Sequence, residues 1–430
     1  MNSREKFLET MNFNPKIGPN KWEFGYWGST IERWYEEGLP KNNYPRVPVN
    51  IINSTTSLYT AAYINEWKKN RNLYEKTFLE PDKKLKLPKG ISVMAGGLSW
   101  PNHGSPLDSD VKDYFGLDTC MMRVSAEQLL YPHFEVKILN ENERYLDYID
   151  IDGGARRFSK IEQVIPNGIG WIIKGRDDWN EIKEQRMALD NIKDRLPDNW
   201  PELVVEYNNR DYPLCLGGYP VGLFGSLTHL IGYEKLFLFF YDEPDLLKDI
   251  LERMTDVWIA VWEEITTDVE IDLANFWEDI SFGKGSMISA QIFKEFLSPY
   301  YKKLVSFLKS KGIKIILADT DGDCNELIPL FIESGITGLY PMEVSSGMDV
   351  AAVRKKYPEL QIMGGIPKSE IAFGKKRIDE FLEPVDWLFK KGGYIPFGDH
   401  FIPPEIPWKE FVYYREKLNS MINNISNNNI

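Results

Sequence analysis

The sequence predicts an α/β protein, built as a (β/α)8 barrel with a β-rich insertion near the barrel mouth. The length of 430 residues suits one barrel that carries insertions. Short apolar runs alternate with helical patterns through the second half of the chain, and polar side chains follow directly after these runs. Strands that alternate with helices indicate a parallel sheet, and several such units at this length favour a closed barrel over an open sheet.

The predicted strand and helix units are read from these apolar runs. The runs occupy residues 214–220, 273–280, 314–322, 338–343, 360–366 and 394–399. The segments that follow them place apolar residues near positions i, i+3, i+4 and i+7, which is typical of amphipathic helices. These helices are expected around 233–265 and at 289–312, 325–335, 349–358, 369–393 and 408–423.

The region of about 105–200 follows a different pattern. Residues 134–160 alternate in the manner of antiparallel strands, with the Asp-Gly-Gly sequence at 152–154 as a turn. We interpret this region as a β-rich subdomain inserted into a single barrel that spans residues 1–430. The Asn-rich tail at 421–430 is expected to be frayed.

Composition excludes several classes of function. A net charge of −13 argues against a nucleic-acid partner, because such binding needs a basic surface. The three scattered cysteines, without a Cys-x-x-Cys pair, do not indicate a disulfide framework or a cysteine-based zinc site. No signal peptide is recognised, and no apolar run approaches the roughly 18 residues of a membrane span. We therefore expect a cytoplasmic protein with a small-molecule substrate and no membrane contact.

The polar residues that follow the apolar runs are the main site candidates. In a (β/α)8 barrel the carboxyl ends of the strands surround the active site, so these side chains should meet at one mouth. Converging carboxylates can raise one another's pKa, bind a metal ion or hold a cationic group of a substrate. Asp323 is expected instead to cap the next helix. For Asp321, a position facing the pocket and a position in the turn are equally expected. The candidates are Tyr219, Glu278, Asp279, Asp319, Asp321, Glu343, Lys368, Asp399 and His400.

Further candidates lie outside the strand ends. His103 is in a loop that could form a pocket wall, while His133 and His229 are interpreted as structural. Trp27 and Arg33 belong to a predicted short helix, where Arg33 could reach a substrate carboxylate. The alternative is a surface helix that packs on the barrel through its aromatic residues. No phosphate-binding loop and no Gly-x-Ser-x-Gly motif is present, so no nucleotide cofactor and no serine hydrolysis are expected.

Five segments together resemble the uroporphyrinogen decarboxylase superfamily: ERWYEEGLP, GLYPMEV, GMDVAAVRKKYP, MGGIPK and GGYIPFGDHFIPPE. The resemblance is strongest over about residues 210–420. It implies a (β/α)8 barrel with its site at the mouth, and the superfamily contains both decarboxylases and corrinoid-dependent methyltransferases. The arginine-rich signature of true uroporphyrinogen decarboxylases (Arg-Gln-Ala-Gly-Arg-Tyr) is missing, so the chain looks nearer to the methyltransferase and uncharacterised branch.

What this resemblance implies is a methyltransferase component that moves a methyl group from a small O- or N-methylated donor to the corrinoid of a partner protein. Glu278, Asp319 or His400 would act as the acid. The His-x-Cys pair of zinc-dependent relatives corresponds to Asp319 and Asp321, so a thiolate zinc site is not expected. A zinc site with oxygen and imidazole ligands would use Asp319, Asp321, Glu343 and His400.

Two other functions remain open at this stage. A decarboxylase acting on a smaller carboxylated substrate would need cationic side chains at the mouth, and the candidates are Arg33, Arg123 and Lys368. A barrel that binds a small ligand without turnover is the third possibility. The sequence leaves the oligomeric state open, and a homodimer is one option.

Overall fold

The computed structural model describes residues 1–14, 18–41, 94–97, 108–159 and 166–427. His103, predicted as a pocket wall, lies outside the described residues. No helix in these ranges is long and apolar enough to cross a membrane.

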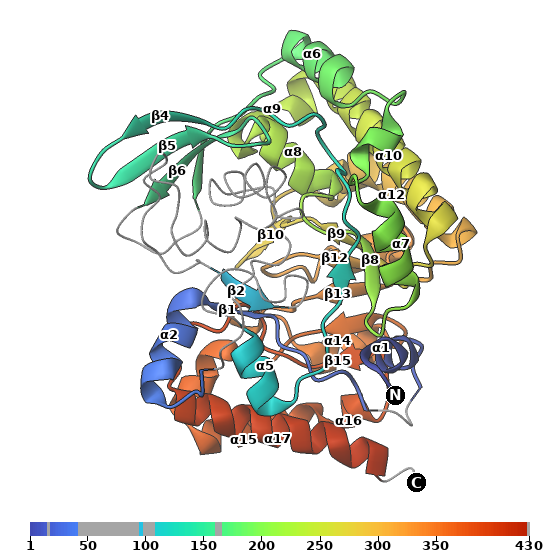
Figure 1. The fold of residues 1–430 in the computed structure, drawn as a ribbon. Helices are drawn as coiled ribbons and strands as arrows, with labels where there is room; N and C mark the ends of the chain where they lie inside the picture. Colours follow the sequence, from blue (N-terminus) through green and yellow to red (C-terminus); the bar gives the residue numbers. More distant parts are fainter. Residues whose placement is uncertain (15–17, 42–93, 98–107, 160–165, 428–430) are drawn as a thin grey trace.

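A curled sheet of parallel strands forms the centre of the molecule (Figure 1). The order of its strands is β15-β14-β13-β12-β9-β8-β3, and every neighbouring pair is parallel. This arrangement confirms the predicted α/β barrel class. The strands are β3 (Met122–Arg123), β8 (Leu214–Gly217), β9 (Leu273–Trp277), β12 (Ile315–Asp319), β13 (Gly338–Tyr340), β14 (Gln361–Met363) and β15 (Tyr394–Ile395).

An N-terminal segment, residues 20–27, joins the two edges of this sheet. On the β3 side, the Lys21 carbonyl accepts from the Asp118 N–H at 3.1 Å, and the Trp22 indole donates to the Thr119 carbonyl at 3.0 Å. On the β15 side, the N–H of Ile402 donates to the Gly25 carbonyl at 2.9 Å. The curled sheet is thus closed by a segment that has little regular pairing of its own.

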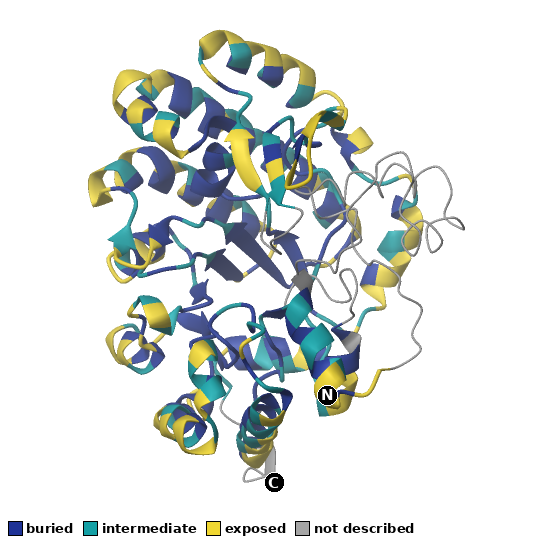
Figure 2. Ribbon diagram, turned by 90° about the vertical axis from the view of Figure 1, so that its left-hand side faces the viewer, coloured by how far each residue is buried: buried dark blue, intermediate teal, exposed yellow. Residues whose placement is uncertain are grey.

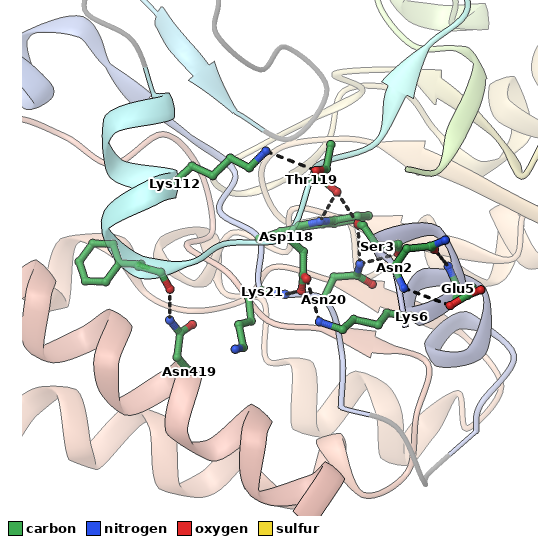
Figure 3. Close-up of polar contacts among 12 residues, drawn as sticks. Asn2, Ser3, Glu5, Lys6, Asn20, Lys21, Lys112, Asp118, Thr119 and Asn419 are labelled. Atoms are coloured by element: carbon green, nitrogen blue, oxygen red, sulfur yellow. Dashed lines mark hydrogen bonds and ion pairs between the residues drawn. The ribbon is translucent and has the colours of Figure 1, made fainter. Parts of the chain in front are cut away.

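Helix α1 (Ser3–Met11) is tied to the same junction, as Figure 3 shows. The Asn20 amide donates to the Ser3 carbonyl at 2.9 Å, and Lys6 lies 2.8 Å from Asp118. Asp118 also accepts from the Lys21 N–H at 2.9 Å. These contacts hold α1 under the end of the barrel that is opposite the strand carboxyl ends.

The core has two layers. An inner cluster fills the barrel, and each parallel strand or its immediate flank contributes to it, together with the closing segment and α1. Its members are Phe7, Met11, Trp22, Met121, Cys215, Leu273, Ile315, Leu317, Tyr340, Met363, Ile395 and Phe397. The second, larger cluster lies between the strands and the surrounding helices. Figure 2 shows the result, with buried strands at the centre and helices exposed on their outward faces.

The helices that follow the strands agree with most of the predicted segments. The predicted helix around 233–265 is two helices, because Pro244 cannot donate a backbone hydrogen bond and starts a new helix. Helix α8 (Leu223–Ile231) was not predicted. The others are α9 (Tyr233–Asp242), α10 (Pro244–Asp268), α11 (Ala290–Ile292) leading through a π-helical turn (Phe293–Leu297) into α12 (Ser298–Ser310), α13 (Ile328–Glu333), α14 (Val350–Lys356), α15 (Lys375–Leu382), α16 (Asp386–Phe389) and α17 (Trp408–Asn427).

Helix α17 reaches into the tail predicted to be frayed, since its last residue is Asn427. The N-terminal half contributes α2 (Gly28–Glu37), α5 (Ser109–Phe115), α6 (Arg176–Arg186) and α7 (Trp200–Asn208). Two small antiparallel pairs lie outside the parallel sheet: β1 (Gly25–Trp27) with β2 (Met94–Gly97), and β10 (Ser281–Phe282) with β11 (Gly285–Ser286).

The predicted insertion contains a separate antiparallel sheet with the order β4-β5-β6-β7. Its strands are β4 (Lys137–Glu141), β5 (Tyr145–Ile149), β6 (Ala155–Ser159) and β7 (Asn167–Gly170). The predicted range of about 105–200 also contains β3, which belongs to the parallel sheet, so the antiparallel part is confined to 137–170. The turn at 150–154 joins β5 to β6 and contains the predicted Asp-Gly-Gly sequence.

Candidate functional site

Three aspartates gather where β9 and β12 end: Asp279, Asp319 and Asp321, here called the mouth acids. Asp319 is the last residue of β12, where it is paired in register with Trp277 of β9 and Tyr340 of β13. Burial raises the pKa of Asp319 well above its usual value, and the charge of Asp321 adds to this effect. Hydrogen bonding to Tyr340 and the charge of Arg123 act in the opposite direction but do not outweigh it.

Asp279 is the mouth acid that was a strand-end candidate in the sequence but for which no catalytic, binding or metal role was predicted. Its backbone has a φ of 44°, which is uncommon for a residue other than glycine and occurs often at functional sites. Burial, followed by the charges of Asp321 and Asp319, raises the pKa of Asp279 well above its usual value. Protonation of this cluster is therefore favoured, because clustered buried carboxylates cannot all ionise readily.

The adjacent Glu278, predicted as a catalytic acid, directs its carboxylate at the first turn of α8. The backbone N–H groups of Leu223, Phe224 and Gly225 donate to it at 2.8, 2.7 and 3.3 Å, and Tyr301 donates its hydroxyl. Burial raises the pKa of Glu278 to about 7, against the lowering effect of these donors. This geometry is that of a carboxylate that caps a helix N-terminus. Side-chain alternation after a strand is the signal that could have favoured Asp279 over Glu278.

Tyr340, on the adjacent strand β13, and Arg123, at the end of β3, both act on Asp319. Asn275 on β9 donates to the Tyr340 hydroxyl at 2.7 Å, and that hydroxyl is hydrogen-bonded to Asp319. Arg123, at the end of β3, is buried, and its guanidinium donates to the Tyr219 carbonyl. Burial lowers the pKa of Arg123 to about 10. Its side chain crosses Gly218, where a Cβ atom would lie 2.5 Å from the Arg123 Cδ, so glycine is needed there.

His400 meets the mouth acids from the loop after β15. Its Nε2 lies 3.4 Å from a carboxylate oxygen of Asp321. The ring stacks on Phe24 with centroids 4.8 Å apart and contacts Phe401 edge-on at 5.1 Å. Asp319, Asp321 and His400, predicted to share one mouth, are therefore connected through Asp321.

Glu343, Lys368 and Asp399 form a second polar group beside the mouth acids. The Lys368 ammonium lies 3.5 Å from both carboxylates. Glu343 also accepts from the Gly322 N–H at 2.9 Å, which links this group to the loop that carries Asp321. Asp399 accepts from the N–H groups of Lys368 and Val344, so it fixes these two loops to each other. The positive charge of Lys368 is thus shared between two acids.

The structure also places the remaining candidates, which are Asp323, Arg33, Trp27 and Tyr219. Asp323 accepts from the Asn325 N–H at 3.0 Å, so it caps a local turn and not the next helix, α13, which begins only at Ile328 without a side-chain cap. Arg33 donates to Glu37 and to the Pro404 carbonyl, both at 2.6 Å. Trp27 contacts Phe401, whose ring also meets His400. Tyr219 follows β8 and contacts Trp277 edge-on, with centroids 4.7 Å apart.

The predicted zinc ligands do not form one coordination set in this arrangement. Asp321 and His400 face each other, but Asp319 is hydrogen-bonded to Tyr340, and Glu343 is paired with Lys368 and the Gly322 N–H. Among the described residues, no group of three or more His, Cys, Asp or Glu side chains is placed to hold a metal ion. We therefore assign no step to zinc, and the zinc site stays a prediction.

A curled parallel sheet with a polar cluster at its carboxyl ends defines a barrel of the class in which the strand ends surround an active site. Residues 210–416 match the protein-family model described as uroporphyrinogen decarboxylase (URO-D). This match supports membership of the chain in the uroporphyrinogen decarboxylase-like superfamily and confirms the resemblance seen in the sequence motifs. It covers all of the mouth acids together with Glu343, Lys368 and His400.

Other comparisons are more distant. No curated protein matches the chain. The chain is similar to the solved structure of 3-keto-D-glucoside 4-epimerase YcjR from E. coli, with 13% identity over 57% of this chain and 93% of that one and a TM-score of 0.31. A D-tagatose 3-epimerase-like protein gives 9% identity over 60% and 97%, with a TM-score of 0.27. A hyperthermophilic beta-glucosidase mutant gives 11% over 69% and 78%, with a TM-score of 0.26. Similarities this weak carry no argument about activity.

Proposed function

We propose that this chain is the methyltransferase component of a corrinoid-dependent system, acting in the cytoplasm on a small O- or N-methylated donor. One observation carries the proposal: the mouth acids include two carboxyl groups, Asp279 and Asp319, whose pKa values are raised well above the usual range. The bond between a methyl carbon and oxygen or nitrogen breaks readily only when the heteroatom can be protonated or is already cationic. Carboxyl groups with a raised pKa suit the first case, and ionised carboxylates suit the second.

The proposed step breaks the bond between the methyl carbon and the heteroatom. The electron pair of that bond stays on the heteroatom, and Asp319 supplies the proton that completes the leaving alcohol or amine. A reduced corrinoid on a partner protein supplies the nucleophile that accepts the methyl group. Tyr340 holds Asp319 through a hydrogen bond, the charge of Arg123 acts on the same carboxyl group, and His400 faces Asp321.

The runner-up is decarboxylation of a smaller carboxylated substrate. It needs cationic side chains that are available to bind carboxylates. Arg33 is paired with Glu37, Lys368 is shared between Glu343 and Asp399, and Arg123 donates to the Tyr219 carbonyl. Because these cations already have partners and acids dominate the mouth, the methyl-transfer proposal is the better supported of the two.

A panel assay tests the proposal. Purified protein is mixed with reduced cobalamin and with small methyl ethers, methylamines and methanol, and the formation of methylcobalamin is followed by its absorbance. Methylation that depends on the protein and on one class of donor is expected. No turnover with any donor, together with release of CO₂ from carboxylated substrates, would reject methyl transfer in favour of decarboxylation. Metal analysis of untagged protein tests the zinc prediction in parallel.

A further inference from the structure

The turn between β5 and β6 reaches from the inserted sheet to the barrel. Asp152 in this turn lies 3.7 Å from the Nδ1 of His229 on α8. The same nitrogen lies 3.1 Å from the hydroxyl of Tyr219, the residue that follows β8. An acid from the insertion and a tyrosine from the barrel therefore meet at one imidazole nitrogen.

The turn itself is held firmly. The Asp152 carboxylate accepts from the Gly154 N–H at 2.8 Å and is paired with Arg156 on β6. Although burial raises the pKa of Asp152, the nearby His229 and the charge of Arg156 outweigh it, so this pKa lies below its usual value. Asp152 is thus a partly buried carboxylate whose position beside His229 is held by Gly154 and Arg156.

Tyr219 connects this contact to the mouth. Its ring and the His229 ring both contact the Trp277 ring edge-on, with centroids 4.7 and 5.0 Å apart. Its carbonyl accepts from Arg123, whose charge acts on Asp319. A small cavity of about 30 Å³ lies where Arg123, Asp152, Tyr219 and His229 converge, which is enough room for water.

We propose that Asp152 and His229 are positioning residues for Tyr219, so that the inserted sheet helps to build the mouth of the barrel. His229 fixes the Tyr219 hydroxyl, and Asp152 fixes the His229 ring. His229 therefore has a role beyond the purely structural one expected from the sequence. The role of Tyr219 in holding a substrate rests on the proposed function, whereas its placement by His229 does not.

The first experiment does not depend on any reaction. 3-Fluorotyrosine is incorporated at position 219 only, and its ¹⁹F signal is recorded in the full-length protein. His229→Phe keeps a ring beside Trp277 but removes the nitrogen, and Asp152→Asn removes the charge while keeping the acceptor for Gly154. Both variants should shift and broaden the signal. The separate variant His229→Gln keeps a polar group at this place, so its signal should lie close to that of the parent protein.

His133→Phe is the matched control. His133 lines the same cavity but pairs with Glu127 at 2.8 Å, so this variant should leave the signal of residue 219 in place. An unchanged signal in either His229→Phe or Asp152→Asn overturns the proposal. Circular dichroism shows whether each variant is folded. If His229→Phe is not folded, the comparison of Asp152→Asn with His229→Gln still tests the proposal.

The second experiment uses methyl transfer to reduced cobalamin with the donor found in the panel. His229→Phe and Tyr219→Phe should each raise KM by roughly three- to tenfold with little change in kcat, the effect of losing one hydrogen bond used for binding. The double variant should be no worse than either single one, because both remove the same interaction. Multiplied effects in the double variant contradict the proposal. A shifted ¹⁹F signal without turnover of any donor would reject the proposed function alone.

Discussion

The imidazole of His400 lies 3.4 Å from the carboxylate of Asp321, although the two residues belong to loops after different strands of the barrel. Asp321 in turn raises the pKa values of Asp279 and Asp319. The contact therefore connects the only histidine predicted to be catalytic with two acids whose pKa values are raised. It makes the strand ends of β9, β12 and β15 parts of one site.

The first prediction concerns Asp319 as the proton donor. Asp319→Asn should lower kcat for methyl transfer by about 10²- to 10⁴-fold, the usual contribution of a positioned acid. The substitution removes a proton donor but keeps the shape of the side chain. Asp323→Asn is the control, since Asp323 caps a turn through Asn325, and this variant should keep most of the activity. Equal losses in the two variants would contradict the assignment.

The pH dependence of the reaction follows from the same acids. Burial, with the charge of Asp321, raises the pKa of Asp319 well above its usual value, so the protonated form needed for proton donation persists to higher pH. The rate constant kcat for an O-methyl donor should therefore fall as pH rises through this raised pKa. Asp321→Asn removes the neighbouring charge, lowers the pKa of Asp319, and should move the fall in rate to lower pH. A pH profile that does not move would reject the coupling.

Glu278 yields a prediction that separates capping from catalysis. Its carboxylate accepts from three N–H groups of the first turn of α8 and from Tyr301. Glu278→Gln puts an amide N–H₂ opposite some of these donors, so the free energy of unfolding should fall by about 1–3 kcal/mol. Urea unfolding measures the change, and Glu333→Gln, at an exposed position, is the control. A rate loss of about a hundredfold or more without a change in stability would instead mark Glu278 as the acid.

The second half of the fold could be predicted because each strand there is a continuous apolar run followed by an amphipathic helix. In the first half, the alternation over residues 134–160 predicted the antiparallel sheet, but two parts of the barrel could not be predicted, for physical reasons that are visible in their residues. Strand β3 is only Met122–Arg123, which is too short to show a period, and the closing segment 20–27 is held largely by side chains and isolated backbone bonds. Neither feature leaves a pattern in the sequence.

The candidate site, too, could be predicted from the sequence only in part. The strand-end rule found Asp319, Asp321, Glu343, Lys368 and His400, because position after an apolar run is a local property. It listed Glu278 and Asp279 together, and the structure shows that Asp279, with its left-handed backbone, joins the mouth acids while Glu278 caps α8. Tyr340 was also missed. Its hydroxyl contacts Asp319 only because β12 and β13 pair in register, and that pairing is set by tertiary structure.

The last prediction concerns Asp150, in the turn that carries Asp152. Asp150 is fully buried, and burial, followed by the charge of Asp152, raises its pKa to about 8. Because the unfolded chain loses this proton near pH 4, the native state binds more protons between about pH 4 and about pH 8. The free energy of unfolding should therefore fall as pH rises through this window.

Asp150→Asn removes the titrating group and keeps a neutral side chain of the same shape. The variant should be more stable than the parent protein at about pH 8, and the two should differ least at about pH 4. Urea unfolding at both pH values measures the difference, and Asp190→Asn, at an exposed position, serves as the control. A stability difference that does not grow between the two pH values would show that Asp150 is ionised in the native turn, with its charge balanced by Arg156.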